Sequence, residues 1–322
     1  MRALVLGATG FVGRALVDAL VEAGDDVRAA SRRPPGTLPE RARWVPCDLL
    51  RPETVAPALE GIEVAYYLVH SMGLGRRDFA AIDRACAHEL ARAAAASSCR
   101  RIIYLGGVAP RGRPSPHLAS RLEVGEILRD GTVPALELRA SMIVGNGSAS
   151  WQIVRDLTAR LPFMVLPRWL ESKSCPIALA DVVAALLEAR RVPLAGSTWF
   201  DIPGPEVLSM RQMLETVAAL EGRRIPSFRV PVLTPRLSAM WLRLISGADY
   251  TLARELVLGL TEDLLPQRSF WEVTGHPARH GFREAAAAAL ASEPSPSPLA
   301  RVVEATVRRV GPSITPREPR RS

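Results

Sequence analysis

The chain has 322 residues, 48% of them hydrophobic and 23% charged, which predicts a globular protein with a sizeable core and excludes the disordered and fibrous classes. Its formal charge is +8, yet Lys173 is the only lysine among the 41 basic residues, and the arginines are scattered. Nucleic-acid binding usually needs a clustered basic stripe, so we expect no nucleic-acid partner.

The cysteines and the apolar segments bear on the compartment. The four cysteines show no CxxC spacing and no Cys/His cluster, so we expect free, buried thiols in a reducing compartment. The start "MRALVLGATG" is too short for a secretory apolar region, and no apolar run reaches the about 18 residues of a membrane span. We therefore expect a cytoplasmic protein without a transmembrane segment.

The first part of the chain alternates short apolar runs with amphipathic segments, which predicts strands alternating with helices. The expected strands cover 2–7, 26–31, 42–46, 63–70, 100–107 and 135–145, and the expected helices cover 11–24, 55–61, 78–98 and 115–129. Gly24 is placed to end the first helix. The pattern predicts an α/β fold of Rossmann type, with a doubly wound parallel sheet covered on both faces.

After residue 147 this alternation breaks down. Helices are expected over 151–162, 178–190 and 209–222, the last begun by Ser209, with an irregular stretch at 163–172 and a strand within 197–205. The apolar segment 232–265 fits the core of a small lobe, and the alternative is a contact surface for a membrane or a partner. We predict a first domain over 1–147, to which 174–202 returns, a small lobe over 148–173 and 203–290, and a mobile Pro/Arg-rich tail over 291–322.

The stretch "LGATGFVG" lies between the first strand and the first helix. It places Gly7, Gly10 and Gly13 at GxxGxxG spacing, where they would allow a tight turn, close approach of a pyrophosphate and close packing of helix on strand. We therefore predict a dinucleotide site at this loop and name the first domain NAD(P)-binding. The residues predicted to bind the dinucleotide here are Gly7, Thr9, Gly10, Phe11, Val12 and Gly13.

The end of the second strand bears on which dinucleotide binds. The sequence "AASRRPPG" offers Ser31, Arg32 and Arg33 where an NAD-specific site would place a carboxylate. Guanidinium groups suit a 2′-phosphate, so NADP(H) is favoured over NAD(H); the alternative is that both arginines are merely solvated. After the third strand, Asp48 and Leu49 could hold an adenine or begin a turn.

Several further motifs follow one family in order: "GATGFVG", "CDLLRPET", "YYLVHSM", "LRASMIVGNGSAS" and "FDIPGPEVLSM". Over residues 1–290 the chain resembles the extended and atypical short-chain dehydrogenase/reductases, and more narrowly a bacterial group called NAD(P)H-binding, NAD-dependent epimerase/dehydratase-like or NmrA-like. The resemblance implies a seven-stranded parallel sheet and a small C-terminal substrate lobe. It also implies a nicotinamide ribose near Leu68, Val69 and His70, and an adenine beside Asp48 and Leu49.

The sequence departs from this family at its catalytic residues. Active members carry a Tyr with a Lys four residues later and a Ser or Thr after the fifth strand. Here the matching positions hold His117, Arg121 and the pair Gly106–Gly107. His117 could act as an acid/base and Arg121 could hold the ribose or an anionic substrate, or both could be remnants of a lost site.

Two functions follow, and the absence of the Tyr, Lys and Ser favours the first over the alternative. One is a dinucleotide-binding protein with a sensing or assembly role that has lost the Tyr/Lys/Ser set. The other is an NADPH-dependent reductase or epimerase that uses a non-Tyr acid such as His117.

The expected partners are the dinucleotide and a small-molecule substrate or a protein partner, and we expect no peripheral membrane contact. Four polar residues are candidates for the substrate pocket: Arg139 and Ser141 at the end of the sixth strand, and Asn146 and Ser148 just beyond it. The motif "GHPARHG" (275–281) predicts a loop, and we expect no metal site.

Overall fold

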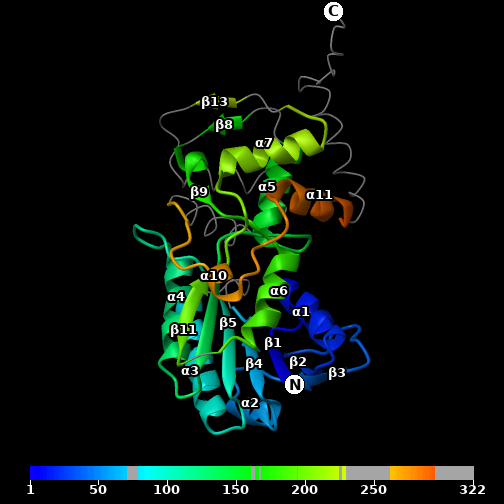
Figure 1. Cartoon of the computed structure of the whole chain (residues 1–322), viewed down its shortest axis with the longest axis vertical. Coiled ribbons are helices and arrows are strands. Elements are labelled where there is room, and N and C mark those ends of the chain that lie inside the picture. The colour runs from blue at the N-terminus through cyan, green and yellow to red at the C-terminus, as the bar shows by residue number, and fades with distance from the viewer. Residues whose placement is uncertain are drawn as a thin grey trace, which may run out of the picture.

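A computed structural model gives the fold, describing residues 1–70, 78–160, 164–166, 168–193, 195–224, 227–229 and 262–293. Seven strands form one parallel sheet in the order β11-β6-β5-β4-β1-β2-β3 (Figure 1). They are β1 (Arg2–Leu6), β2 (Asp26–Ser31), β3 (Ala42–Pro46), β4 (Val64–Tyr67), β5 (Arg101–Gly107), β6 (Ala135–Ala140) and β11 (Thr198–Asp201). The expected doubly wound parallel sheet is confirmed.

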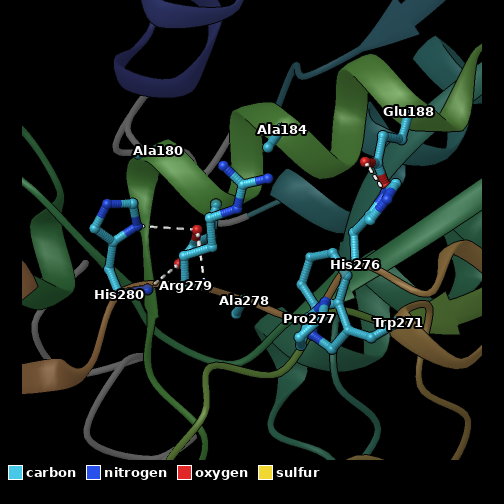
Figure 2. A pocket seen from close by; sticks show the side chains of 10 residues that line it. Ala180, Ala184, Glu188, Trp271, His276, Pro277, Ala278, Arg279 and His280 are labelled. Atoms are coloured by element: carbon cyan, nitrogen blue, oxygen red, sulfur yellow. Dashed lines mark hydrogen bonds and ion pairs between the residues drawn. The ribbon is translucent and has the colours of Figure 1, made fainter.

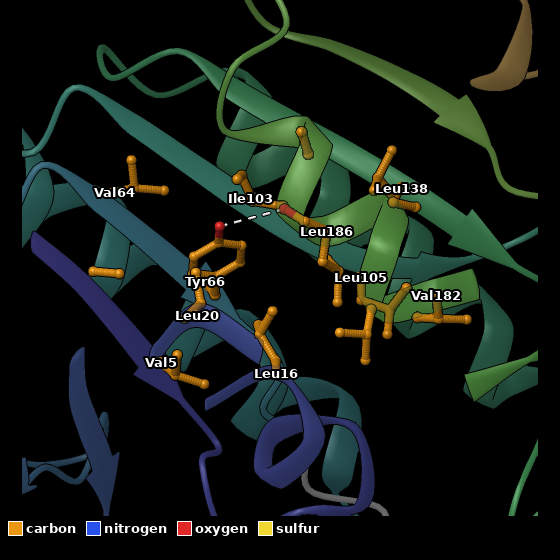
Figure 3. Packing of buried hydrophobic residues seen from close by; sticks show 14 of the residues in the cluster. Val5, Leu16, Leu20, Val64, Tyr66, Ile103, Leu105, Leu138, Val182 and Leu186 are labelled. Atoms are coloured by element: carbon orange, nitrogen blue, oxygen red, sulfur yellow. Dashed lines mark hydrogen bonds between the residues drawn. The ribbon is translucent and has the colours of Figure 1, made fainter. Parts of the chain in front are cut away.

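Helices cover both faces of the sheet. Helices α1 (Phe11–Glu22) and α6 (Leu179–Ala189) bury Leu16, Leu20, Val182 and Leu186 against one face. Figure 3 shows this core around Tyr66, whose hydroxyl donates to the Leu186 carbonyl oxygen at 3.3 Å. The other face is covered by α2 (Pro52–Leu59), α3 (Phe79–Ala95) and α4 (Pro116–Arg129).

A second group of helices packs beyond the end of the sheet (Figure 1). Helices α5 (Ala149–Arg160), α7 (Met210–Leu220) and α11 (Phe282–Ala291) share a separate apolar cluster that contains Trp151, Met213 and Phe282. Short strand pairs lie among them: β7 (Ile143–Val144) with β10 (Ile177–Ala178), β8 (Met164–Leu166) with β13 (Ser227–Arg229), and β9 (Lys173–Ser174) with β12 (Leu208–Ser209). A 3-10 turn (Arg168–Glu171) and α10 (Trp271–Thr274) complete the described elements.

Some expected boundaries were wrong. The expected strand over 135–145 is two strands, because β7 leaves the main sheet to pair with β10. The helix expected over 55–61 begins three residues earlier, at Pro52, since proline at the first helical position has no N–H to lose. The expected strand over 63–70 ends at Tyr67, and the stretch expected to be irregular contains β8.

Other expectations were confirmed or lie outside the described residues. Gly24 adopts a positive φ of 83° directly after α1, which suits the end of a helix. Ser209 begins α7 as expected. Of the expected apolar segment 232–265, residues 232–261 lie outside the described residues. Residues 294–322 of the expected tail also lie outside them.

Candidate functional site

The turn between β1 and α1 has the geometry that a pyrophosphate needs. Gly7 has a φ of 86°, and a Cβ there would lie 2.9 Å from the Leu68 carbonyl oxygen. A Cβ on Gly13 would lie 2.2 Å from the Gly7 carbonyl oxygen, so the helix can approach the turn only because residue 13 is glycine. Gly10 caps α1 without any side-chain hydrogen bond, which leaves the first N–H groups of the helix for an anion. The chain therefore fits a dinucleotide phosphate here.

The residues around this turn are partly accessible. Thr9, Phe11 and Val12 are half-buried, and Gly10 is exposed. Phe11 packs under a second loop, because a Cβ on Gly145 would lie 2.8 Å from its Cζ. That these residues contact a cofactor remains a prediction.

The three residues at the end of β2, Ser31 and the two arginines after it, differ in what they can offer a ligand. The Ser31 hydroxyl donates to the Arg33 carbonyl oxygen at 2.6 Å and accepts from the Trp44 indole nitrogen at 3.1 Å. The Ser31 hydroxyl hydrogen therefore already makes a hydrogen bond within the protein. Arg32 and Arg33 are exposed beside it, so their guanidinium groups can reach a phosphate.

Asp48 and Leu49 have clear local roles. Asp48 accepts from the Leu50 N–H at 3.1 Å, and its own N–H donates to Thr54 at 2.9 Å, which is the geometry of a turn that starts α2. Leu49 is buried in the core between the sheet and α2 and α3. Turn formation accounts for both residues, and adenine binding by them remains a prediction.

The end of β4 reaches the same edge of the sheet as the glycine turn. Leu68 donates its N–H to the Leu6 carbonyl oxygen at 3.0 Å, and Leu68 and Val69 are half-buried. The His70 side chain keeps contact with solvent. Desolvation by the surrounding protein, followed by the positive charge of Arg121, lowers the pKa of His70 to about 4. His70 is thus neutral at pH 7.

His117 lies on the first turn of α4. Ser115 caps this helix, its hydroxyl accepting from the Leu118 N–H at 3.3 Å. The Nδ1 atom of His117 is buried and has no hydrogen-bond partner among the described residues. Its ring lies 6.5 Å from that of Phe79, centroid to centroid. Desolvation, then the charges of Arg121 and His70, lowers the pKa of His117 to about 3.

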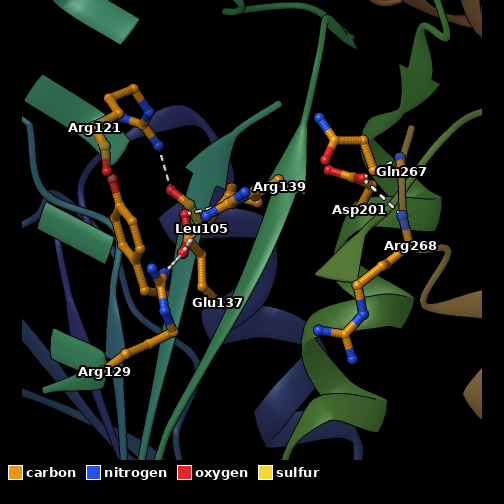
Figure 4. Close-up of polar contacts among 9 residues, drawn as sticks. Leu105, Arg121, Arg129, Glu137, Arg139, Asp201, Gln267 and Arg268 are labelled. Atoms are coloured by element: carbon orange, nitrogen blue, oxygen red, sulfur yellow. Dashed lines mark hydrogen bonds and ion pairs between the residues drawn. The ribbon is translucent and has the colours of Figure 1, made fainter. Parts of the chain in front are cut away.

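Arg121 is fastened to the end of β5 (Figure 4). Its guanidinium donates to the Leu105 carbonyl oxygen and lies 5.6 Å from the centroid of the Tyr104 ring. The Tyr104 hydroxyl donates back to the Arg121 carbonyl oxygen at 3.0 Å. A Cβ on Gly107 would lie 2.7 Å from Leu118 and 3.8 Å from Arg121 Nε, so α4 fills the space beside that glycine.

The described tyrosines and the lysine do not replace the missing Tyr and Lys. Tyr66, Tyr67 and Tyr104 are buried in central strands, where desolvation raises their pKa values. Lys173 is exposed on β9, and Tyr250 lies outside the described residues.

The four candidates at the end of β6 and beyond it all make hydrogen bonds within the protein. Arg139 pairs with Glu137, and the Ser141 hydroxyl donates to the Cys175 carbonyl oxygen at 2.9 Å. Asn146 donates to the Ser292 carbonyl oxygen at 2.7 Å, and Ser148 caps α5 through the Trp151 N–H at 3.4 Å. These bonds give each of the four side chains a structural role, and contact with a substrate remains a prediction.

The motif "GHPARHG" is a loop, as expected, and it closes a pocket of about 280 Å³ against α6 (Figure 2). His276 Nδ1 lies 2.9 Å from Glu188, and His280 Nδ1 lies 3.0 Å from Asp181. These pairs tie the loop to α6. In the part of the chain that the structure describes, no three His, Cys, Asp or Glu residues gather as a metal site would require.

Two further observations concern the whole described chain. All four cysteines are buried and unpaired, and burial raises the pKa of Cys47 to about 11. Among the described helices, none combines the length and the apolar character needed to cross a bilayer.

Glu137 was missed by the sequence reasoning. It is 1% exposed on β6 and pairs with both Arg129 and Arg139. The signal was present: "ALELRA" carries two charges of opposite sign inside an otherwise apolar strand.

Similar proteins extend this description. The profile of a family described as NAD(P)H-binding matches residues 7–156. The ceramide reductase of Caulobacter vibrioides is 30% identical over 235 residues, which are 70% of this chain and 73% of that protein. An uncharacterised Mycobacterium tuberculosis protein is 27% identical over 264 residues, or 79% of this chain, and the match spans only 28% of the mycobacterial protein.

A solved structure agrees with the fold. A short-chain dehydrogenase/reductase superfamily protein from Agrobacterium tumefaciens with bound NAD matches with a TM-score of 0.64 at 19% identity, covering 96% of this chain and 99% of that one. At this identity the likeness concerns the fold alone. Together with the glycine turn, the family profile and the match to the ceramide reductase place the chain in the NAD(P)H-binding family, and its seven-stranded sheet has the fold of a short-chain dehydrogenase/reductase superfamily protein.

Proposed function

We propose that the chain is an NADP(H)-dependent reductase that acts on the carbonyl group of a largely apolar substrate, with His117 as the acid. The observation that carries the proposal is the buried Nδ1 of His117, which has no hydrogen-bond partner among the described residues and lies on the same helix as Arg121, one turn away. A buried polar atom without a partner costs free energy unless a ligand satisfies it. The ceramide reductase among the relatives supports a lipid-like substrate.

The preference for NADP(H) rests on the residues after β2. Arg32 and Arg33 are exposed, and no carboxylate stands beside them in "SRRPP" to accept from a ribose 2′-hydroxyl. A guanidinium pairs readily with a phosphate through charge-assisted hydrogen bonds.

When bound, NADPH supplies a hydride to the carbonyl carbon. Because its pKa is low, His117 is a neutral imidazole at pH 7 and holds one N–H for the substrate oxygen. As negative charge develops on that oxygen, the imidazole N–H transfers its proton to it, water returns a proton to the ring, and the product is an alcohol beside a neutral imidazole. Arg121 keeps its proton throughout and stabilises the charge electrostatically.

A test needs a substrate and a matched control. We expect the purified chain to oxidise NADPH with a long-chain ketone analogue of ceramide. His117→Gln should lower turnover by about 10²–10⁴-fold, the usual contribution of one acid/base group, with little change in NADPH affinity. His88→Gln, at an exposed histidine of α3, is the control and should keep the parent rate.

The second candidate is a sensing or assembly protein that binds the dinucleotide without chemistry. The packing around Gly107 favours this candidate. Side chains of α4 fill the space next to Gly107, where active members of the family would place a Ser or Thr hydroxyl. In that case NADPH would bind, no carbonyl compound would be reduced, and His117→Gln would change no rate. Full turnover in His117→Gln would instead reject His117 as the acid.

A further inference from the structure

Four residues of α4 lie on one face of the helix. His117, Arg121, Gly125 and Arg129 are spaced four apart, and such residues stack along a helix. The middle of this face is fastened to β5 through Arg121, whose side chain and carbonyl group both bond to that strand. Its far end is fastened to β6 through Arg129, which pairs with Glu137.

Glu137 occupies a space that two glycines leave open. A Cβ on Gly106 of β5 would lie 2.5 Å from Glu137 Oε1, and a Cβ on Gly125 of α4 would lie 2.4 Å from Oε2. The carboxylate therefore lies between the strand and the helix, where any side chain on either glycine would collide with it. Its place determines how closely α4 approaches the sheet.

The carboxylate is also held from β6 (Figure 4). Arg139 donates to it through Nε at 2.9 Å and Nη2 at 3.2 Å, and the Arg139 guanidinium stacks 4.1 Å from the Trp199 ring centroid on β11. Glu137 is 1% exposed and Arg139 is 6% exposed. A buried ion pair of this kind seldom adds more stability than apolar residues of similar volume would, and its attested use is to fix one arrangement.

We propose that Glu137 is a positioning residue that fixes the rotation and the axial position of α4, and thereby the placement of His117 and Arg121. Among the described residues, the hydrogen bonds and ion pairs of Glu137 go to Arg129 and Arg139 and not to either of these two. It acts through Gly125 and Arg129, which follow Arg121 by one and two turns on the same face. The inference rests on the proposed function only in naming His117 and Arg121 as the groups that need placing.

The test separates placement from stability. In Gly125→Ala the new methyl group collides with the carboxylate, so α4 must shift while every charge stays. We expect the ring ¹H–¹⁵N signals of His117 to move in the NMR spectrum of the folded protein, and turnover on the ketone to fall by about 10²-fold with KM nearly unchanged. Gly196→Ala is the control, because a Cβ there meets nothing within 4 Å.

A rescue makes the test specific. Glu137→Asp shortens the carboxylate, so Gly125→Ala combined with Glu137→Asp should return the His117 signals toward the parent positions. If Gly125→Ala fails to fold, Glu137→Gln, which keeps the shape and removes the charge, provides the same comparison. Unchanged His117 signals in a folded, merely less stable variant would overturn the proposal. The NMR result stands even if the chain reduces no carbonyl compound, so the two proposals fail separately.

Discussion

At the scale of single residues, the two histidines at the sheet edge make stability depend on pH. Folding lowers the pKa of His117 to about 3 and that of His70 to about 4, from 6.5 in the unfolded chain. At pH values between the folded pKa values and 6.5, the unfolded chain binds more protons than the folded chain. The free energy of unfolding therefore falls as the pH drops below about 6.5, and these two histidines add nothing to it at higher pH.

This predicts a flatter pH dependence in His117→Gln. Urea unfolding at pH 4.5, 5.5, 6.5 and 7.5 should show a smaller slope of the unfolding free energy than the parent has between pH 4.5 and 6.5. Because His117 is half-buried, the difference should stay below the single-proton limit of about 1.4 kcal/mol per pH unit. Equal slopes in parent and variant would show that the imidazole is not desolvated.

Arg32 bears on the choice of cofactor. Charge-assisted hydrogen bonds contribute roughly 1.5–3 kcal/mol, so Arg32→Ala should weaken NADPH binding by about tenfold or more and leave NADH binding unchanged. Fluorescence titration of both nucleotides measures this. Arg43→Ala, at an exposed arginine of β3, is the control. Equal affinity of the parent for both nucleotides would remove the basis of the NADP(H) preference.

At the scale of elements, the beginning of α7 illustrates how a short motif determines a helix. Ser209 accepts from the Gln212 N–H at 3.2 Å, and Gln212 accepts from the Ser209 N–H at 2.8 Å, forming a capping box. Ser209→Ala should lower the unfolding free energy by about 1 kcal/mol. The double variant with Gln212→Ala should lose less than the sum of the single losses, since the two bonds are reciprocal. Additive losses in chemical denaturation would contradict this.

Element types were easier to predict than element ends. The apolar runs of β1 and β5 and the amphipathic pattern of α1 determine their structure locally, so the sequence sufficed there. The break inside 135–145 depends on β10, more than thirty residues later, and no local pattern reveals it. The pairs β8–β13 and β9–β12 escaped prediction for the same reason.

At the scale of the whole molecule, the parallel sheet followed from strand–helix alternation, and its seven strands from the family resemblance. Part of the candidate site could be predicted from the sequence, because residue spacing indicated the glycine turn and the position of α4. Glu137 did not, because its role depends on Gly106 and Gly125 meeting across two elements. A pattern of residues along the sequence cannot show which residues of different elements pack against one another.

The place of β11 has a consequence for synthesis. β6 ends at Ala140, and its outer neighbour β11 begins only at Thr198, so a growing chain carries β6 as an open edge while the intervening residues are made. Open edges of apolar strands recruit other chains. A ribosome that stalls, or a protease that cuts, between these strands would therefore leave a nearly complete sheet whose one missing strand makes it prone to aggregate.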